Sequence, residues 1–136
     1  MESEITLTFS LPPAGLRRNH EANRYTANAL KDAYSETMYH EWIRQGAPTI
    51  MRPMREGEFD AEVVWNQCGT GDTDNCLSAL KPMFDVLGMA PVSAAGANRY
   101  YLGWYESDSQ IKRITVERER VSKKALEGVT ITLRAR

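Results

Sequence analysis

One segment constrains the fold of this chain more than any other. It is a strand pattern followed directly by a glycine turn, two aspartates and an amphipathic helix. Apolar residues alternate with polar ones in the strand, at Phe59, Ala61, Val63 and Trp65. This period of two predicts a half-buried strand. The turn Gly69-Thr70-Gly71 follows, and residues 74–87 repeat apolar side chains at helical spacing. A sheet and a helix must therefore pack as layers, with Asp72 and Asp74 at the strand end, which is a rigid place for a site.

Three further strands follow from the same kind of alternation. Residues 5–11 predict an opening strand, and residues 129–133 predict a closing one. Residues 111–117 predict a strand between them in the sequence. Within it, Ile111 is out of phase with Ile114, so we expect a bulge or a later strand start.

One further helix and the strand connections complete the expected fold. Residues 26–45 place apolar side chains at helical spacing, at Leu30, Tyr34, Met38 and Trp42. Thr26 or Asn28 can cap this helix. We expect the last two strands to pair antiparallel through Glu127-Gly128. The order strand, helix, strand, helix, strand, strand predicts an α+β domain, with two main helices packed on a small mixed β-sheet of about four strands.

Size and composition fit a single domain over residues 1–136. The chain has 136 residues, 42% of them hydrophobic, and domains commonly have about 100–150 residues. No apolar run approaches the roughly 20 residues that span a bilayer. The start, Met1-Glu2-Ser3-Glu4, is acidic and lacks the basic region and apolar core of a signal peptide. We therefore expect a cytoplasmic protein with no membrane partner.

The helix over residues 74–87 is expected to carry a polar stripe. Spacings close to whole turns put four polar side chains on one face, at Asp74, Ser78, Lys81 and Asp85. The opposite face is apolar, with Leu77, Leu80, Met83, Phe84 and Leu87. Pro82 requires either a bend in this helix or a regular part that begins near Ser78.

Closely spaced carboxylates repel one another as anions, and a hard divalent cation such as Mg²⁺ is the usual reason to assemble them. A further ligand from a distant segment is then needed, and Asp108 stands just before the strand at residues 111–117. The ammonium of Lys81 can stabilise negative charge that develops on a phosphate. The alternative is a solvated helix face with spaced charge pairs, in which an aspartate at the helix entry serves as an N-cap.

The order of these motifs resembles the RusA family of Holliday-junction resolvases. Three stretches carry the resemblance, Asp72-Thr73-Asp74-Asn75, Ala79-Leu80-Lys81-Pro82-Met83-Phe84-Asp85-Val86-Leu87 and Ser107-Asp108-Ser109-Gln110. The opening Ile5-Thr6-Leu7-Thr8, followed by Leu11-Pro12-Pro13 and Asn19, is similar to the first strand and loop of that family. The resemblance covers nearly the whole chain. Ser107 stands where the family commonly has a first aspartate, and the segment from Gly88 to Glu106 is longer than the family's usual link.

The resemblance implies a small homodimeric, Mg²⁺-dependent endonuclease, with Mn²⁺ as an alternative ion, that resolves four-way DNA junctions by paired nicks. Phages or prophages encode many members of this family. Under this resemblance Asp72, Asp74 and Asp108 are metal ligands and Lys81 is the catalytic lysine. Asp85 is placed to orient Lys81 or a metal-bound water. Asn75 is placed to hydrogen-bond a carboxylate or to cap the helix.

Local basic residues are the candidates for DNA contacts, because the net charge of -1 gives no general attraction to phosphate. Arg17, Arg18 and Asn19 follow the first strand, and Lys112 and Arg113 follow Asp108. These side chains can line a groove that leads to the acids, and a homodimer would present each of them twice. The alternative is that they are solvated charges of a loop and an edge strand.

The aromatic residues before Asp108 have two interpretations. They are Tyr100, Tyr101, Trp104 and Tyr105. Stacking on unpaired DNA bases is one interpretation, and packing within a loop or a dimer interface is the other. Two other functions remain open for the chain, a metal-dependent nuclease for other branched DNA and a non-catalytic protein that binds DNA junctions.

Overall fold

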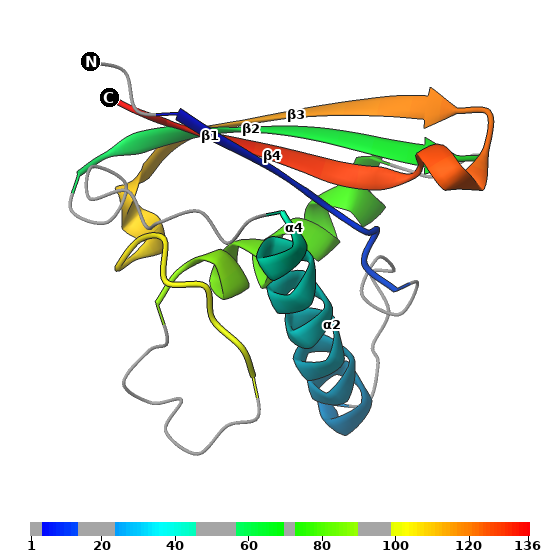
Figure 1. Ribbon diagram of the computed structural model, residues 1–136, viewed down its shortest axis with the longest axis horizontal. Coiled ribbons are helices and arrows are strands. Elements are labelled where there is room, and N and C mark those ends of the chain that lie inside the picture. The colour runs from blue at the N-terminus through cyan, green and yellow to red at the C-terminus, as the bar shows by residue number, and fades with distance from the viewer. Residues whose placement is uncertain (1–3, 14–23, 46–56, 70–72, 90–98) are drawn as a thin grey trace.

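The computed structural model describes residues 4–13, 24–45, 57–69, 73–89 and 99–136, and for residues 24–27 and 73–76 it describes the backbone alone. Four strands and two α-helices form the fold, together with two short 3-10 helices (Figure 1). Their order is β1 (Glu4–Phe9), α2 (Arg24–Arg44), β2 (Phe59–Cys68), α4 (Thr73–Leu87), η2 (Asp108–Gln110), β3 (Ile111–Val121), η3 (Lys124–Leu126) and β4 (Gly128–Ala135). The predicted α+β class, with a small mixed sheet and two main helices, is confirmed.

The strand order in the sheet is β1-β4-β2-β3. β4 pairs antiparallel with β1 and with β2, whereas β3 pairs parallel with β2. The predicted antiparallel pair of the last two strands is therefore wrong, because β2 lies between them. Burial explains the order. β4 buries alternate apolar residues and takes an inner position, while β3 has no buried residue and lies at the edge.

The predicted break in phase between Ile111 and Ile114 is confirmed as a bulge. Phe59 pairs with Ile111 and Asp60 pairs with Arg113, so the register shifts by one residue at this point. A bulge inserts one unpaired residue and reverses the alternation of side chains along its strand. Ile111 and Ile114 can therefore both face the helices.

Both helices pack on the same face of the sheet (Figure 1). The core between the layers contains Trp65 of β2, Ile131 of β4, Met38 of α2 and Met83 of α4, each at most 2% exposed. α2 begins at Arg24, so Thr26 and Asn28 lie inside the helix and do not cap it. In the described part of the chain, no helix is long and apolar enough to cross a membrane.

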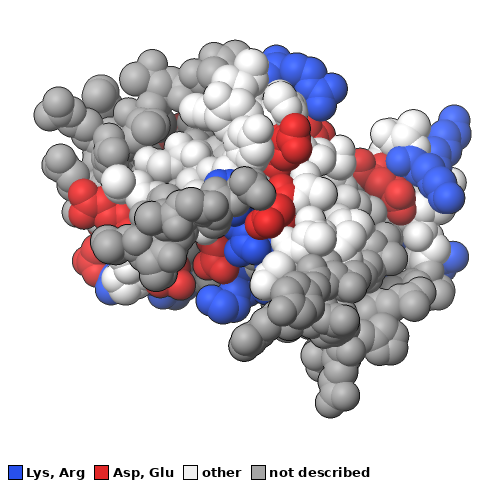
Figure 2. Space-filling view, turned by 90° about the horizontal axis from the view of Figure 1, so that it is seen from below, with Lys and Arg blue, Asp and Glu red and all other residues white. Residues whose placement is uncertain are grey.

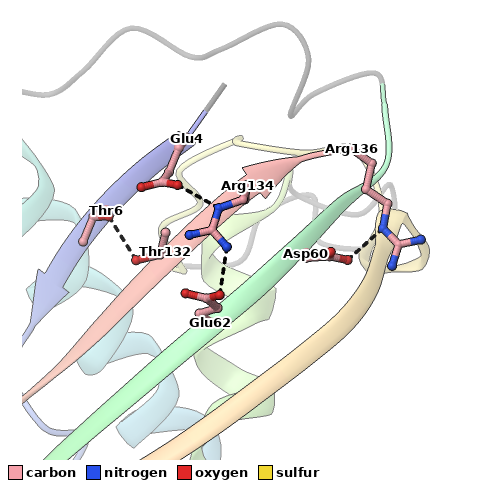
Figure 3. A network of polar contacts seen from close by, with 7 residues as sticks. All are labelled: Glu4, Thr6, Asp60, Glu62, Thr132, Arg134 and Arg136. Atoms are coloured by element: carbon pink, nitrogen blue, oxygen red, sulfur yellow. Dashed lines mark hydrogen bonds and ion pairs between the residues drawn. The ribbon is translucent and has the colours of Figure 1, made fainter. Parts of the chain in front are cut away.

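The opposite face of the sheet carries a network of polar side chains (Figure 3). Arg134 lies between two acids, with its Nε 2.8 Å from Glu4 and its Nη1 2.8 Å from Glu62. Beside it, the hydroxyls of Thr6 and Thr132 are 3.0 Å apart. These contacts connect β1, β4 and β2 across the sheet and satisfy polar groups on this face.

Candidate functional site

The helix that carries the predicted polar stripe is continuous from Thr73 to Leu87, with Pro82 inside it. Pro82 lacks the N–H that would reach the carbonyl of Ser78 four residues earlier. Lys81 directly precedes this proline, and Asp85 follows Lys81 by one helical turn. The Nζ of Lys81 lies 3.9 Å from the Oδ1 of Asp85. The predicted shared face of Lys81 and Asp85 is therefore confirmed. Their side chains are 77% and 43% exposed, so this ion pair contributes little stability and both groups stay accessible.

A hydrogen-bonded turn holds Asp108 in front of β3. Ser107 is the N-cap of η2, and its Oγ accepts a hydrogen bond from the N–H of Ser109. The Oε1 of Gln110 accepts from the N–H groups of Glu106 and Ser107, at 2.8 and 3.0 Å. Its Nε2 donates to the carbonyl of Gly57 at 2.6 Å, which ties the turn to the start of β2. The turn therefore fixes the backbone of Asp108 and leaves the residue exposed.

Asp108 meets the second half of α4 at two adjoining cavities. Phe84, Asp85 and Asp108 line both of them. The first, of about 360 Å³, also takes polar side chains from Arg99 and Glu106. The second, of about 400 Å³, also takes Lys81 on its wall. The structure thus brings Lys81, Asp85 and Asp108 to one hollow beside the helix.

The second cavity is mostly apolar, because Leu77 of α4 faces it together with Ile114 and Val116 of β3. Leu77 was expected on the buried face of the helix, but it is 49% exposed. The reason is that β3 is the last strand of the described sheet, so no further strand among the described residues covers this side of α4. Ile114 is exposed to the same extent, 49%.

Tyr105 lies between the first cavity, which it lines, and the core. It is 1% exposed, and its hydroxyl donates a hydrogen bond to the carbonyl of Phe84. Burial raises the pKa of this phenol well above its ordinary value, and the nearby charges of Asp85 and Asp108 raise it further. Tyr105 is therefore a neutral donor that holds the end of α4 against the segment leading to Asp108.

The backbone of Asp74 lies at the other end of the helix. The backbone of Asp74 and Asn75 is in the first turn of α4, and Asp72 lies outside the described residues. At about 1.5 Å rise per residue, Asp74 and Asp85 are about 16 Å apart along the helix axis. Ligands of one Mg²⁺ lie at about 2.0–2.1 Å from the ion. Asp85 and Asp74 of one chain therefore cannot share a metal ion.

Within the side chains that the structure describes, no group of three or more histidines, cysteines, aspartates or glutamates is close enough to hold a metal ion. Asp108 and Asp85 supply two carboxylates at the cavity. The side chains of Asp72 and Asp74 are not among those described. The predicted trio Asp72, Asp74 and Asp108 thus stays a prediction.

Only some of the predicted DNA-contacting residues are among those that the structure describes. Arg17, Arg18 and Asn19 lie outside the described residues. Lys112 is at the bulge of β3, with its Nζ 2.9 Å from the Oε2 of Glu58. Arg113 is exposed beside it, opposite Asp60 of β2. On the helix-covered side, the visible acidic and basic side chains are interspersed (Figure 2).

The aromatic segment is divided between the core and the surface. Trp104 and Tyr105 are buried, which confirms packing for these two residues. Tyr100 is 37% exposed, and its ring lies 5.0 Å from that of Tyr39 on α2. Sequence reasoning missed Leu77 and Ile114 as cavity residues. The signal for them was the run of charges along both faces of residues 111–120, which is typical of an edge strand.

Neither a scan against protein-family models nor a search of curated proteins gives a significant match for this chain.

Proposed function

We propose that the protein is a Mg²⁺-dependent endonuclease, with Mn²⁺ as an alternative ion, that cuts branched DNA, with the four-way junction as its substrate. One observation carries the proposal. The Lys81–Asp85 pair and Asp108 line one cavity beside α4, the helix whose first turn contains Asp74 and Asn75. The RusA-like order of these residues supports the same activity.

In the proposed mechanism, Asp72, Asp74 and Asp108 are the residues that would hold the metal, whose chemistry is to polarise the scissile phosphate and lower the pKa of the attacking water. Lys81 offsets the negative charge that develops on the phosphate. Asp85, whose Oδ1 lies 3.9 Å from the Nζ of Lys81, would orient that ammonium. Asn75 orients one of the carboxylates.

The proposal requires two copies of the chain. In one chain, Asp108 lies beside the second half of α4, and the backbone of Asp74 lies in the first turn of that helix. A two-fold pair of chains can bring Asp108 of one copy to the first turn of α4 in the other. Two such sites would also give the paired nicks that resolve a four-way junction.

A cleavage assay on a synthetic four-way junction, beside linear duplex and flap DNA, tests the activity with and without Mg²⁺. We expect paired symmetric nicks in the junction from the wild type. Asp74→Asn should bind the junction and lose cleavage, because a ligand carboxylate is removed while the net charge becomes more favourable for DNA. Asp85→Asn should slow cleavage by about 10–100-fold, as expected for a residue that orients others at a metal site.

Asp60→Asn is the matched control, since this carboxylate accepts a hydrogen bond from Arg136 away from the cavity. It should cut like the wild type. Cleavage retained by Asp74→Asn would contradict the site. Equal cutting of flaps would indicate a nuclease for other branched DNA. Junction binding that is indifferent to Mg²⁺ and leads to no cut would indicate a non-catalytic junction-binding protein.

A further inference from the structure

The outer edge of β3 is long and open. β3 has 11 residues and, within the described parts of the chain, pairs with β2 alone, at the end of the sheet. Among the described residues, no side chain or backbone group bonds to its outer edge. A strand edge of this length offers a row of unpaired N–H and C=O groups, which another strand can bind.

Apolar side chains adjoin this open edge on the helix-covered face. Ile114 and Val116 of β3 and Leu77 of α4 line the cavity of about 400 Å³. Ile114 and Leu77 are each 49% exposed. A partner strand that extends the sheet would cover this groove and bury these side chains, which favours association.

The sequence of β3 is complementary to itself in one antiparallel register. Residues directly opposite each other in an antiparallel pair point to the same face. With the two-fold axis at Thr115, Ile114 faces Val116 of the second copy on the groove side. Arg113 then faces Glu117 of the second copy on the other side. Both pairs occur twice by symmetry, so this register joins apolar with apolar and basic with acidic side chains.

Neighbouring registers fit less well. An axis at Val116 places Ile114 opposite Arg118, and an axis at Glu117 places that carboxylate opposite itself. In the register centred on Thr115, the like-charge pair Lys112 with Arg118 falls at the bulge. There the Nζ of Lys112 lies 2.9 Å from the Oε2 of Glu58, which offsets its charge.

We propose that β3 binds β3 of a second copy of this chain in antiparallel register centred on Thr115, so that the two sheets form one continuous sheet. This interface goes beyond the proposed nuclease activity, since it needs neither metal nor DNA. It also brings the start of β3, next to Asp108, alongside the end of β3 in the second copy, which lies next to the end of β2 there. The proposed nuclease needs this arrangement, because it places Asp108 of one copy near the first turn of α4 in the other.

A charge exchange tests the register, with sedimentation of the full chain over a range of concentrations as the readout. Arg113→Glu should raise the dissociation constant of the dimer by at least about tenfold, because the new glutamate at position 113 then faces Glu117 of the other copy. Glu117→Arg should raise it in the same way, because the new arginine then faces Arg113 of the other copy. The double variant Arg113→Glu with Glu117→Arg should restore wild-type association. Circular dichroism of each variant shows whether the chain is folded.

Ile114→Glu is a second disrupting variant, since its side chain is half exposed in one chain and is opposed by Val116 in the pair. It should also give folded monomers. A monomeric wild type, or a dimer that tolerates Ile114→Glu, would overturn the proposal. Rescue of Arg113→Glu by Glu119→Arg in place of Glu117→Arg would overturn the register. None of these results depends on cleavage, so they are separate from a failure of the nuclease proposal.

Discussion

The two edges of the sheet are finished in opposite ways. At the β1 edge, the side chain of Gln45, at the end of α2, makes the backbone hydrogen bonds that a neighbouring strand would make. Its Oε1 accepts from the N–H of Thr8 at 2.9 Å, and its Nε2 donates to the carbonyl of Thr8 at 2.8 Å. Glu41 accepts from the N–H of Ser10 at 3.0 Å. At the β3 edge, no described residue makes such a contact.

The difference shows which edge can accept a partner. An edge strand whose polar groups are already bonded has little to offer another strand, whereas an open edge promotes pairing unless charges or bulges prevent it. β3 has a bulge at one end only, and its charges are complementary in the register centred on Thr115. The chain therefore closes one edge by itself, and the proposed interface places a second copy at the other.

The largest effect on the closed edge is expected from Met38→Ala. Met38 is fully buried on α2, the helix that brings Glu41 and Gln45 to β1. Its truncation should cost about 2–5 kcal/mol in the free energy of unfolding. Urea denaturation measures this loss. Thr37→Ala is the control, because Thr37 is exposed on the same helix and should change stability by less than about 0.5 kcal/mol. Equal losses in the two variants would contradict the packing of α2.

A smaller effect is expected from Gln45→Ala, which opens the β1 edge without disturbing the core. The two bonds to Thr8 are exposed, so their loss should cost about 1 kcal/mol in the free energy of unfolding. Hydrogen exchange should become faster at the amide of Thr8. At the amide of Ile131, in the middle of β4, the rate should change only as much as global stability does. An unchanged rate at Thr8 would show that Gln45 does not close this edge.

The sequence predicted the elements well because their signals are local. Alternation located the strands, and helical spacing located both helices. The order of strands was not predictable in this way, since β4 pairs with β1 through contacts between distant residues. A local clue to the edge position of β3 did exist, because charges occupy both of its faces at Arg113, Glu117 and Arg118.

The candidate site was predictable where it depends on one helix. The spacing of Lys81 and Asp85 predicts their contact directly. The approach of Asp108 to Asp85 depends on the parallel crossover from β2 through α4 to β3, which no local pattern specifies. For the same reason, a sequence motif alone does not reveal that Asp108 lies beside Phe84 and Asp85, in the second half of α4, whereas Asp74 lies in the first turn of that helix.

Mixing two inactive variants tests most directly whether two copies build one site. Asp74→Asn and Asp108→Asn chains are each assayed alone and after exchange of subunits, on a four-way junction with Mg²⁺. If Asp74 of one copy works with Asp108 of the other, a mixed dimer contains one intact site. The mixture should then regain about a quarter of the wild-type nicking rate, since half of the dimers are mixed and each has one of two sites. If the mixture stays as inactive as its parents although subunits exchange and the wild type cuts, the shared site is contradicted.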